Sequence, residues 1–309
     1  MCEKQILPFE ATPGDGEFEL TIWRPEGECK AVVQVLHGMA EHIERYDRMA
    51  RALCAAGYAV AGHNHKGHGP KCDKSRLGYF YDRDGWNHNV ENAHYVSAML
   101  RDLFPGKKLV LLGHSMGSFM AREYALRYGD ELFALVLSGT GSQPAFVCAF
   151  ARLIAKLSPQ KKPAKLVDKL AFGSYNKPFA PNRTAFDWLS RDNQEVDKYV
   201  SDELCGFMFT GGAFADFFEG LLKLSNASRL SDMPEGLPVL FISGDHDPVG
   251  AMGKGVKKVA RQFENAGIAN VTVKLYPGAR HELFNETNRE EVYHDLISWL
   301  DEELKRPAN

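Results

Sequence analysis

The stretch LVLLGHSMG, residues 109–117, leads from an apolar run into a serine that stands between two glycines. The run is typical of a strand covered on both faces, and residues 118–128 continue it with a helical pattern. At a sharp strand-to-helix turn a Cβ at Gly113 or Gly117 would clash, so such a turn needs glycine at both positions. We therefore predict that Ser115 is a nucleophile exposed at the end of a buried strand, rather than a capping serine in an ordinary glycine turn.

Strand and helix patterns alternate on both sides of this stretch. Apolar strand patterns cover residues 18–23, 31–36, 58–62 and 133–137, and helical patterns cover residues 41–56 and 86–103. After a break, strands are expected at 239–243 and 271–276, and helices at 253–266 and 290–304. The alternation predicts a mostly parallel central sheet flanked by helices on both faces.

The break in this alternation runs from residue 142 to about residue 236, where helix formers and aromatic residues dominate. A chain of 309 residues is twice the modal domain length of about 150 residues. One interrupted domain explains that length better than two tandem domains. We predict an α/β core in two parts, residues 1–141 and 237–309, with a helical cap at residues 142–236.

The base expected for Ser115 is His281, which follows the strand pattern at 271–276. The carboxyl ends of parallel strands meet at one edge of a sheet, so this loop and Ser115 are expected at the same edge. A serine hydroxyl is a weak nucleophile until a base takes its proton, and an imidazole is the usual base. A lone histidine is more often structural, but here its place in the chain is the one that the third member of a triad requires.

The acid is expected from GDHDPV at residues 244–249, directly after the strand at 239–243. Either aspartate of this turn could hold the base in its correct tautomer. Asp247 is favoured because Pro248 fixes the turn behind it. Asp245 is the alternative acid, and its other interpretation is a residue that caps or braces the turn.

Two backbone N–H groups are expected to hold the oxyanion of a tetrahedral intermediate. Met116, the residue after the nucleophile, supplies one of them. Met39 is the expected second donor, on the loop after the strand at 31–36, where Gly38 permits a close approach of the backbone. The alternative interpretation of this loop is a simple turn at the end of a strand.

Four stretches carry this chemistry together: HGMAEH at 37–42, GHNHKGHG at 62–69, LGHSMG at 112–117 and SGDHDPV at 243–249. They resemble the α/β-hydrolase superfamily and, within it, the branch of serine aminopeptidase-like enzymes, monoacylglycerol lipases and lysophospholipases. The resemblance covers residues 16–141 and 237–304. It implies an α/β-hydrolase fold with a helical cap inserted after the sixth strand of that fold. It also implies the triad Ser115, Asp247 and His281, with backbone donors at Met39 and Met116.

One position departs from this branch. The second stretch often carries an acidic residue where this chain has Asn64. The departure concerns the bracing of a loop and leaves the triad unaffected.

The cap of this fold lies over the strand ends, so its inward side chains are expected to contact substrate. The candidates are aromatic: Phe146, Phe150, Phe209, Phe214 and Phe217. An apolar wall of this kind favours acyl chains or other apolar acyl groups. We therefore predict a cofactor-free serine hydrolase that cleaves carboxylic esters through an acyl-enzyme. By resemblance, monoacylglycerols or lysophospholipids are its favoured small-molecule substrates.

Two alternatives stay open. An aminopeptidase or amidase would use the same triad and would place acidic cap residues around a free amino group. Such residues exist, although a solvated helix face is their commoner role: Glu195, Asp197, Asp202 and Glu203. A catalytically silent binding module of the same fold is the second alternative, and such proteins usually lack a member of the triad.

Composition restricts the kinds of partner and bound metal that are expected. The net charge is −3, with 37 Lys and Arg against 40 Asp and Glu and no block of like charge, which argues against nucleic acid as a partner. The six cysteines form no C-x-x-C pair, and the histidines at 63–68 match no standard zinc spacing, so no metal is expected. Hydrogen bonds to backbone are the expected role of those histidines. The N-terminus shows no apolar signal segment, so a cytoplasmic location is expected.

Residues 159–169 raise the question of lipid contact. Four lysines of this segment lie near two leucines in the sequence: Lys161, Lys162, Lys165, Lys169, Leu157 and Leu166. The composition is typical of a solvated cap surface and is also compatible with transient contact with a membrane surface.

Overall fold

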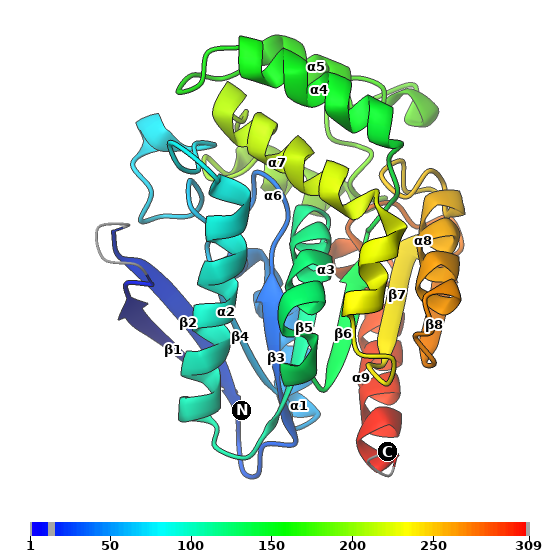
Figure 1. Cartoon of the computed structure of the whole chain (residues 1–309). Coiled ribbons are helices and arrows are strands. Elements are labelled where there is room, and N and C mark those ends of the chain that lie inside the picture. The colour runs from blue at the N-terminus through cyan, green and yellow to red at the C-terminus, as the bar shows by residue number, and fades with distance from the viewer. Residues whose placement is uncertain (1, 12–15, 307–309) are drawn as a thin grey trace.

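The computed structural model describes residues 2–11 and 16–306 of the chain. Its centre is an eight-stranded sheet with the strand order β1-β2-β4-β3-β5-β6-β7-β8 (Figure 1). The strands are β1 (Cys2–Phe9), β2 (Phe18–Pro25), β3 (Ala31–Leu36), β4 (Ala59–His63), β5 (Lys108–His114), β6 (Ala134–Ser138), β7 (Val239–Gly244) and β8 (Val271–Tyr276). From β4 to β8 neighbouring strands pair in parallel, whereas β2 pairs antiparallel with both β1 and β4. The predicted mostly parallel sheet is confirmed.

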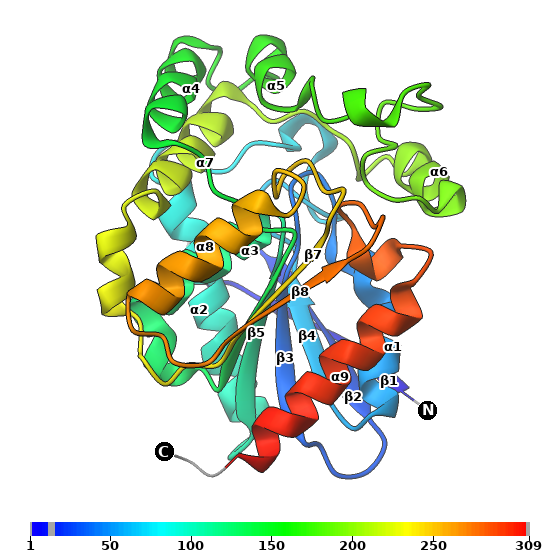
Figure 2. The same ribbon diagram turned by 90° about the vertical axis from the view of Figure 1, so that its right-hand side faces the viewer.

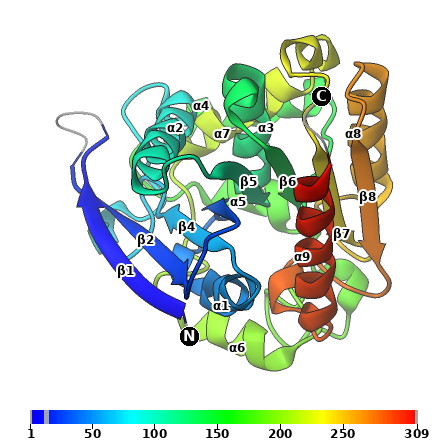
Figure 3. The ribbon, with the colours of Figure 1, turned by 90° about the horizontal axis from the view of Figure 1, so that it is seen from below.

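Helices cover both faces of this sheet, as Figures 2 and 3 show from two further directions. The helices α1 (Asp47–Ala55) and α9 (Arg289–Lys305) cover one face. The helices α2 (Gly85–Leu103), α3 (Met116–Tyr128) and α8 (Lys254–Asn265) cover the other. In β3, Val33 and Val35 pack in the first layer while Val32 and Leu36 pack in the second, which follows from the period of two along a strand.

The structure contains one strand that the sequence did not predict, and one predicted helix begins later than expected. The strand β1 lies at the sheet edge and is largely exposed, so it has no apolar pattern by which hydropathy could reveal it. The helix expected from residue 41 begins only at Asp47, after a 3-10 turn at Ile43–Tyr46. Glu41, which was expected to begin this helix, is turned inward instead. Its carboxylate accepts a hydrogen bond from the Tyr46 hydroxyl at 2.8 Å.

The predicted helical cap after the sixth strand is also confirmed. It contains the four α-helices between β6 and β7: α4 (Ala145–Leu157), α5 (Lys165–Phe172), α6 (Asn193–Ser201) and α7 (Gly211–Leu224). The cap lies over the carboxyl ends of the parallel strands (Figure 1). Helix α7 packs on α2 and α3 of the core and carries α4 on its outer side. The loops at the strand ends therefore lie between sheet and cap.

Candidate active site

Ser115 lies between the end of β5 and the start of α3 with φ 51° and ψ −120°. A residue with a Cβ pays about 1–3 kcal/mol for such a backbone conformation, and a hydrogen bond from its N–H to the carbonyl of Ser138 at 2.9 Å helps to hold it. A Cβ on Gly113 would lie 2.3 Å from the carbonyl oxygen of Gly117, and a Cβ on Gly117 would lie 2.0 Å from that of Leu36. Both glycines are therefore required by contact with backbone, which cannot give way.

The loops after β7 and β8 bring Asp247 and His281 together. Nδ1 of His281 lies 2.9 Å from Oδ2 of Asp247, and the two side chains are 2% and 0% exposed. The other carboxylate oxygen of Asp247 accepts the N–H of Val249 at 2.8 Å. Because Asp247 engages Nδ1, Nε2 is the nitrogen of His281 that remains for proton transfer.

Asp245 makes a different set of contacts. Its Oδ1 accepts the N–H of Gly278 at 2.7 Å and lies 2.6 Å from Nδ1 of His246. These contacts tie the loop after β7 to the loop after β8. The geometry thus favours Asp247 as the carboxylate partner of His281, and it gives Asp245 a bracing position.

Electrostatics favour the protonated form of His281. Burial by itself lowers the pKa of an imidazole, but here the charge and hydrogen bond of Asp247 outweigh it, and the pKa is raised above its usual value of about 6.5. The carboxylates of Glu282 and Glu41 act in the same direction. An imidazolium formed at this position is therefore stabilised.

The backbone N–H groups of Met39 and Met116 have no hydrogen-bond partner among the residues that the structure describes. Met116 begins α3, where an N–H of the first turn has no acceptor within the helix. Both residues line the cavity that Ser115 also lines. Two free donors beside one hydroxyl are what an oxyanion hole requires.

The loop that carries Met39 is held by contacts from core and cap. The N–H of Gly38 donates to Oε1 of Glu41 at 2.5 Å. The carbonyl of Ala40 accepts two hydrogen bonds from the cap, from the hydroxyl of Tyr199 at 3.0 Å and from the N–H of Gly206 at 2.9 Å. The backbone next to Met39 is therefore pinned on both sides.

Arg45 joins this loop to the loop of His281. Its Nη1 lies 2.7 Å from Oε2 of Glu41, and its Nη2 lies 2.6 Å from Oε2 of Glu282, the residue after His281. All three side chains are at most 11% exposed. A buried arginine between two carboxylates satisfies charges that would otherwise be costly to bury.

Two of the three histidines at 63–68 contact backbone groups. Nε2 of His65 lies 3.2 Å from the carbonyl oxygen of His37, and Nε2 of His68 accepts the N–H of residue 40 at 3.2 Å. His63 does not, because both of its ring nitrogens are buried without a hydrogen-bond partner among the described residues. Burial lowers the pKa of His65 to about 4 and that of His68 to about 3, so both are neutral near pH 7. Asn64 braces the same region, because its Oδ1 accepts the N–H of residue 43 at 2.9 Å.

A cavity of about 670 Å³ lies between the strand ends and the cap. Ser115 and His281 line it together with the backbone donors described above. Its wall is mainly apolar, and the helices that contribute to it include α3 with Phe119, α4 with Ile154, α5 with Val167 and α7 with Leu221. The cavity is large enough to hold a small ester with an extended apolar chain.

The cap phenylalanines divide into three groups. Phe150 and Phe217 line the cavity, and their contact with substrate stays a prediction. Phe146 does not: it is 76% exposed on the outer side of α4. Phe209 and Phe214 do not line it either, because they are buried and pack against each other with ring centroids 5.7 Å apart. Composition cannot tell the inner side of a cap from its outer side or its own core, so the prediction is wrong for these three residues.

Sequence reasoning missed two aromatic residues next to the candidate base. The Trp188 ring lies 5.0 Å from that of His281 and 5.1 Å from that of Tyr175, and both aromatic residues line the cavity. They lie between α5 and α6, outside the α-helices. No periodic pattern marks such residues, so only their aromatic character was available as a signal.

The family described as serine aminopeptidase, S33, matches residues 27–288. The chain belongs to this family. Its relatives include a monoacylglycerol lipase of Mycolicibacterium smegmatis, 30% identical over 288 residues that cover 90% of this chain and 91% of the relative. The monoglyceride lipase of Homo sapiens is 29% identical, with 96% and 93% covered. A solved structure of a thermostable carboxyl esterase from Bacillus coagulans superimposes with a TM-score of 0.89 at 28% identity, covering 97% of this chain and 99% of that one.

This S33-family chain therefore has the α/β-hydrolase fold and is a serine ester hydrolase. Of its helices that the structure describes, none combines the length and the apolar character needed to cross a bilayer.

The aminopeptidase alternative depended on four acidic residues of the cap that could bind a free amino group. In this S33-family hydrolase these residues pair with other side chains. Glu195 pairs with Arg48 at 3.0 Å, and Asp202 lies 2.8 Å from Nε2 of His42. The other two carboxylates have surface cations as partners: Asp197 pairs with Arg183 and Glu203 pairs with Lys74. None of the four is among the residues lining the cavity described above.

Proposed function

We propose that this chain hydrolyses carboxylic esters with an apolar acyl group, of the monoacylglycerol or lysophospholipid kind, through the triad Ser115, Asp247 and His281. The single observation that carries this proposal is the cavity of about 670 Å³, in whose mainly apolar wall Ser115, His281 and two unpaired backbone N–H groups meet. The pairing of His281 with Asp247 supports the assignment of base and acid.

In the first half of the reaction, Oγ of Ser115 attacks the ester carbonyl carbon while Nε2 of His281 takes its proton. The carbonyl oxygen becomes an oxyanion and is held by the N–H groups of Met39 and Met116. When the intermediate collapses, the bond to the alcohol oxygen breaks, and His281 returns the proton to that oxygen. The products of this half are the free alcohol and an acyl-enzyme.

In the second half, water replaces the alcohol. His281 takes a proton from the water as it attacks the acyl carbon, the same two N–H groups hold the new oxyanion, and the proton passes to Oγ of Ser115 as the carboxylic acid leaves. Asp247 keeps the proton of His281 on Nδ1 between steps and stabilises the imidazolium. The raised pKa of His281 agrees with this role, because it reflects the same carboxylate.

The neighbourhood of the cavity supports an acyl chain as the occupant. Val147, Phe150 and Leu170 line the cavity and are also 40%, 64% and 60% exposed, so the apolar wall continues onto the outer surface of the cap. Each methylene group of an acyl chain that is buried along this apolar wall makes binding more favourable. The names of the relatives agree with this substrate class: monoacylglycerol lipase and monoglyceride lipase.

We also propose transient contact between this part of the cap and a lipid surface. Helices α4 and α5 expose large apolar side chains: Phe146, Phe150, Leu153, Leu157, Leu166 and Leu170. Lys156, Lys162, Lys165 and Lys169 are on or near the same two helices and are exposed. Apolar groups that enter the acyl boundary, beside cations that meet anionic headgroups, are the composition of an interfacial surface.

A substrate panel tests the proposed reaction. The enzyme is offered monoacylglycerols and p-nitrophenyl esters of increasing chain length, a lysophospholipid, and aminoacyl amides with a free amino group. We expect turnover of the esters, with kcat/KM rising with chain length until the cavity is filled. A preference for the aminoacyl amides would contradict the proposal and favour an aminopeptidase. Absence of both turnover and labelling of Ser115 by a fluorophosphonate would favour a silent binding module.

A further inference from the structure

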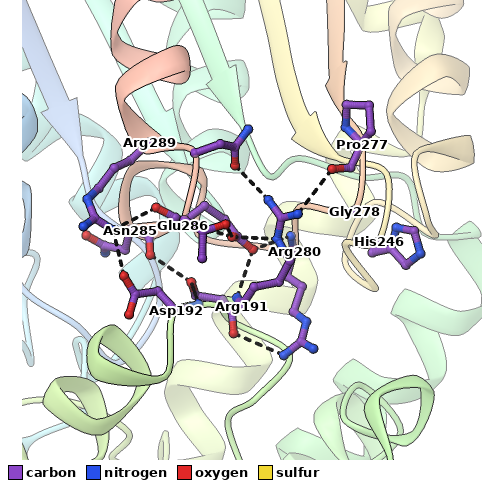
Figure 4. A network of polar contacts seen from close by, with 12 residues as sticks. Arg191, Asp192, His246, Pro277, Gly278, Arg280, Asn285, Glu286 and Arg289 are labelled. Atoms are coloured by element: carbon purple, nitrogen blue, oxygen red, sulfur yellow. Dashed lines mark hydrogen bonds and ion pairs between the residues drawn. The ribbon is translucent and has the colours of Figure 1, made fainter.

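A segment of the cap, residues 187–192, runs beside the loop that carries His281, residues 280–289 (Figure 4). The N–H of Glu282 donates to the carbonyl of Leu189 at 2.7 Å, and the hydroxyl of Ser190 donates to the carbonyl of Asn285 at 2.8 Å. The backbone that follows His281 is thus bonded to the cap.

Glu286 is the centre of this contact. Its carboxylate is fully buried and accepts four N–H groups. Two come from its own loop, the backbone N–H groups of Arg280 at 2.9 Å and Thr287 at 2.9 Å. The other two come from Arg191 of the cap, its backbone N–H at 3.0 Å and its Nε at 2.9 Å. Since Arg280 precedes His281, one carboxylate fixes the backbone next to the candidate base and ties it to the cap.

Two further arginine contacts close the same junction, as Figure 4 shows. The second guanidinium nitrogen of Arg191, Nη2, donates to Oδ1 of Asn288 at 2.8 Å. In the opposite direction Arg289 donates from the histidine loop to Asp192 of the cap at 2.8 Å. The junction therefore contains two ion pairs of opposite direction, Arg191 with Glu286 and Arg289 with Asp192.

We propose that Glu286 is a positioning residue for His281 and that Arg191 makes the cap a part of this positioning. The inference rests on the proposed function, in which His281 is the base. Proton transfer requires Nε2 within about 0.5 Å of its productive place, and a displacement of about 1 Å can cost about 100-fold in rate. Charge-assisted hydrogen bonds, such as those to the buried carboxylate of Glu286, are shorter and about twice as strong as neutral ones, so they restrict the movement of the loop.

The test replaces each end of the link and compares it with a matched carboxylate elsewhere. Glu286→Gln removes the charge and one acceptor. Arg191→Met removes the guanidinium contacts of the cap with Glu286 and Asn288, while the backbone N–H of residue 191 and the donors of the loop itself remain. The matched control is Glu123→Gln. Glu123 is 1% exposed on α3 and pairs with Arg127 and Arg229 at 2.7 Å each, so it is an equally buried carboxylate between two arginines. It does not line the cavity.

The measurements are kcat and KM for a short soluble ester such as p-nitrophenyl butyrate, with the melting temperature of each variant. We expect Glu286→Gln to lower kcat about 10- to 100-fold with KM within about threefold. Arg191→Met should lower kcat about five- to tenfold in the same way. The double variant should lose less than the product of the two, because both act through one link. Glu123→Gln should lower the melting temperature but keep kcat within about twofold.

Unchanged kcat in both Arg191→Met and Glu286→Gln, or a loss in Glu123→Gln as large as theirs, would overturn the inference. If Glu286→Gln does not fold, Arg191→Met decides alone by the same split between kcat and KM. The proposed function is judged separately through Ser115→Ala. Full turnover in that variant would refute the proposed reaction, whereas a dead Ser115→Ala with unaffected Arg191→Met and Glu286→Gln would refute only the positioning role.

Discussion

At the carboxyl edge of the sheet, Asp247 and His281 are 0% and 2% exposed and in contact, whereas on helix α4 of the cap Phe146 and Leu157 are 76% and 81% exposed. The polar side chains of the first region are buried and paired. The apolar side chains of the second are left in solvent. Each region thus carries an unfavourable arrangement that folding alone does not require.

The difference separates two tasks. At the carboxyl edge of the sheet the backbone fixes the positions of the candidate catalytic atoms. The strand ends and the sharp turn at Ser115 with its two flanking glycines, here called the elbow, leave few other conformations possible. On the cap the apolar face needs no single geometry, because burial of apolar groups is non-directional. We therefore expect substitutions at the edge to change rates by orders of magnitude, and substitutions on the outer cap to change access to substrate by smaller factors.

The largest effect is expected for Ser115→Ala. In the proposed reaction Oγ forms the acyl-enzyme, so kcat for p-nitrophenyl esters should fall on the order of 10^5- to 10^6-fold in this variant. Ser174, which lines the cavity from the cap side, is the control, and Ser174→Ala should keep kcat within about threefold. A comparable loss in the two variants would erase the distinction between edge and cap.

The next effect separates the two aspartates of the turn after β7. Asp247→Asn leaves His281 without its carboxylate, and kcat should fall about 10^4-fold. Asp245→Asn loosens the bracing of Gly278 and should cost about tenfold or less. Steady-state kinetics of the pair checks this order, and a larger loss at Asp245 would reverse the assignment of the acid.

A third prediction uses pH. In the proposed reaction His281 must be neutral to act as the base, and Asp247 raises its pKa above 6.5 against the effect of burial. The value of kcat/KM for a soluble ester should therefore fall about tenfold per pH unit below a midpoint that lies above 6.5. Residual activity of Asp247→Asn should show its midpoint at lower pH. The cap variant Phe150→Ser should leave the midpoint where it is, and a shift there would mean that cap and base are coupled through the pocket wall.

The smallest effect is expected on the outer cap. Phe146→Ser with Leu157→Ser removes two exposed apolar groups without touching the cavity lining, so turnover of a short soluble ester should stay within about twofold. Binding to vesicles of phosphatidylcholine with phosphatidylserine should weaken about tenfold in a sedimentation assay. The matched control is Ile6→Ser, an apolar residue 49% exposed on the edge strand β1. Equal loss of vesicle binding in the control would contradict a specific lipid-facing surface.

The parts predictable from sequence are those in which chemistry restricts residue identity at one position. The elbow needs Gly113 and Gly117 because each Cβ would meet backbone oxygen. The loops of Asp247 and His281 could be placed at one edge because each follows a strand of a parallel sheet. The role of each of these residues stays a prediction until the variants are measured.

The parts that could not be predicted are those in which the residue type does not determine where the side chain lies in the fold. Phe209 and Phe214 look like Phe217 in the sequence, yet only Phe217 lines the cavity. Trp188 gave no periodic signal, although its ring lies 5.0 Å from that of His281. Strand β1 is exposed along most of its length, so its pairing with β2 rather than its hydropathy makes it a strand.

Sequence by itself determined the alternation of strands and helices, the elbow and the place of the interruption, because local backbone preference and the period of apolar residues are read along the chain. Only the tertiary structure decided which cap side chains face the cavity and that Glu286 joins Arg191 to the histidine loop, with the two residues 95 positions apart in the chain. A buried carboxylate takes whichever donors the fold brings to it, and no pattern of neighbours along the chain encodes that choice.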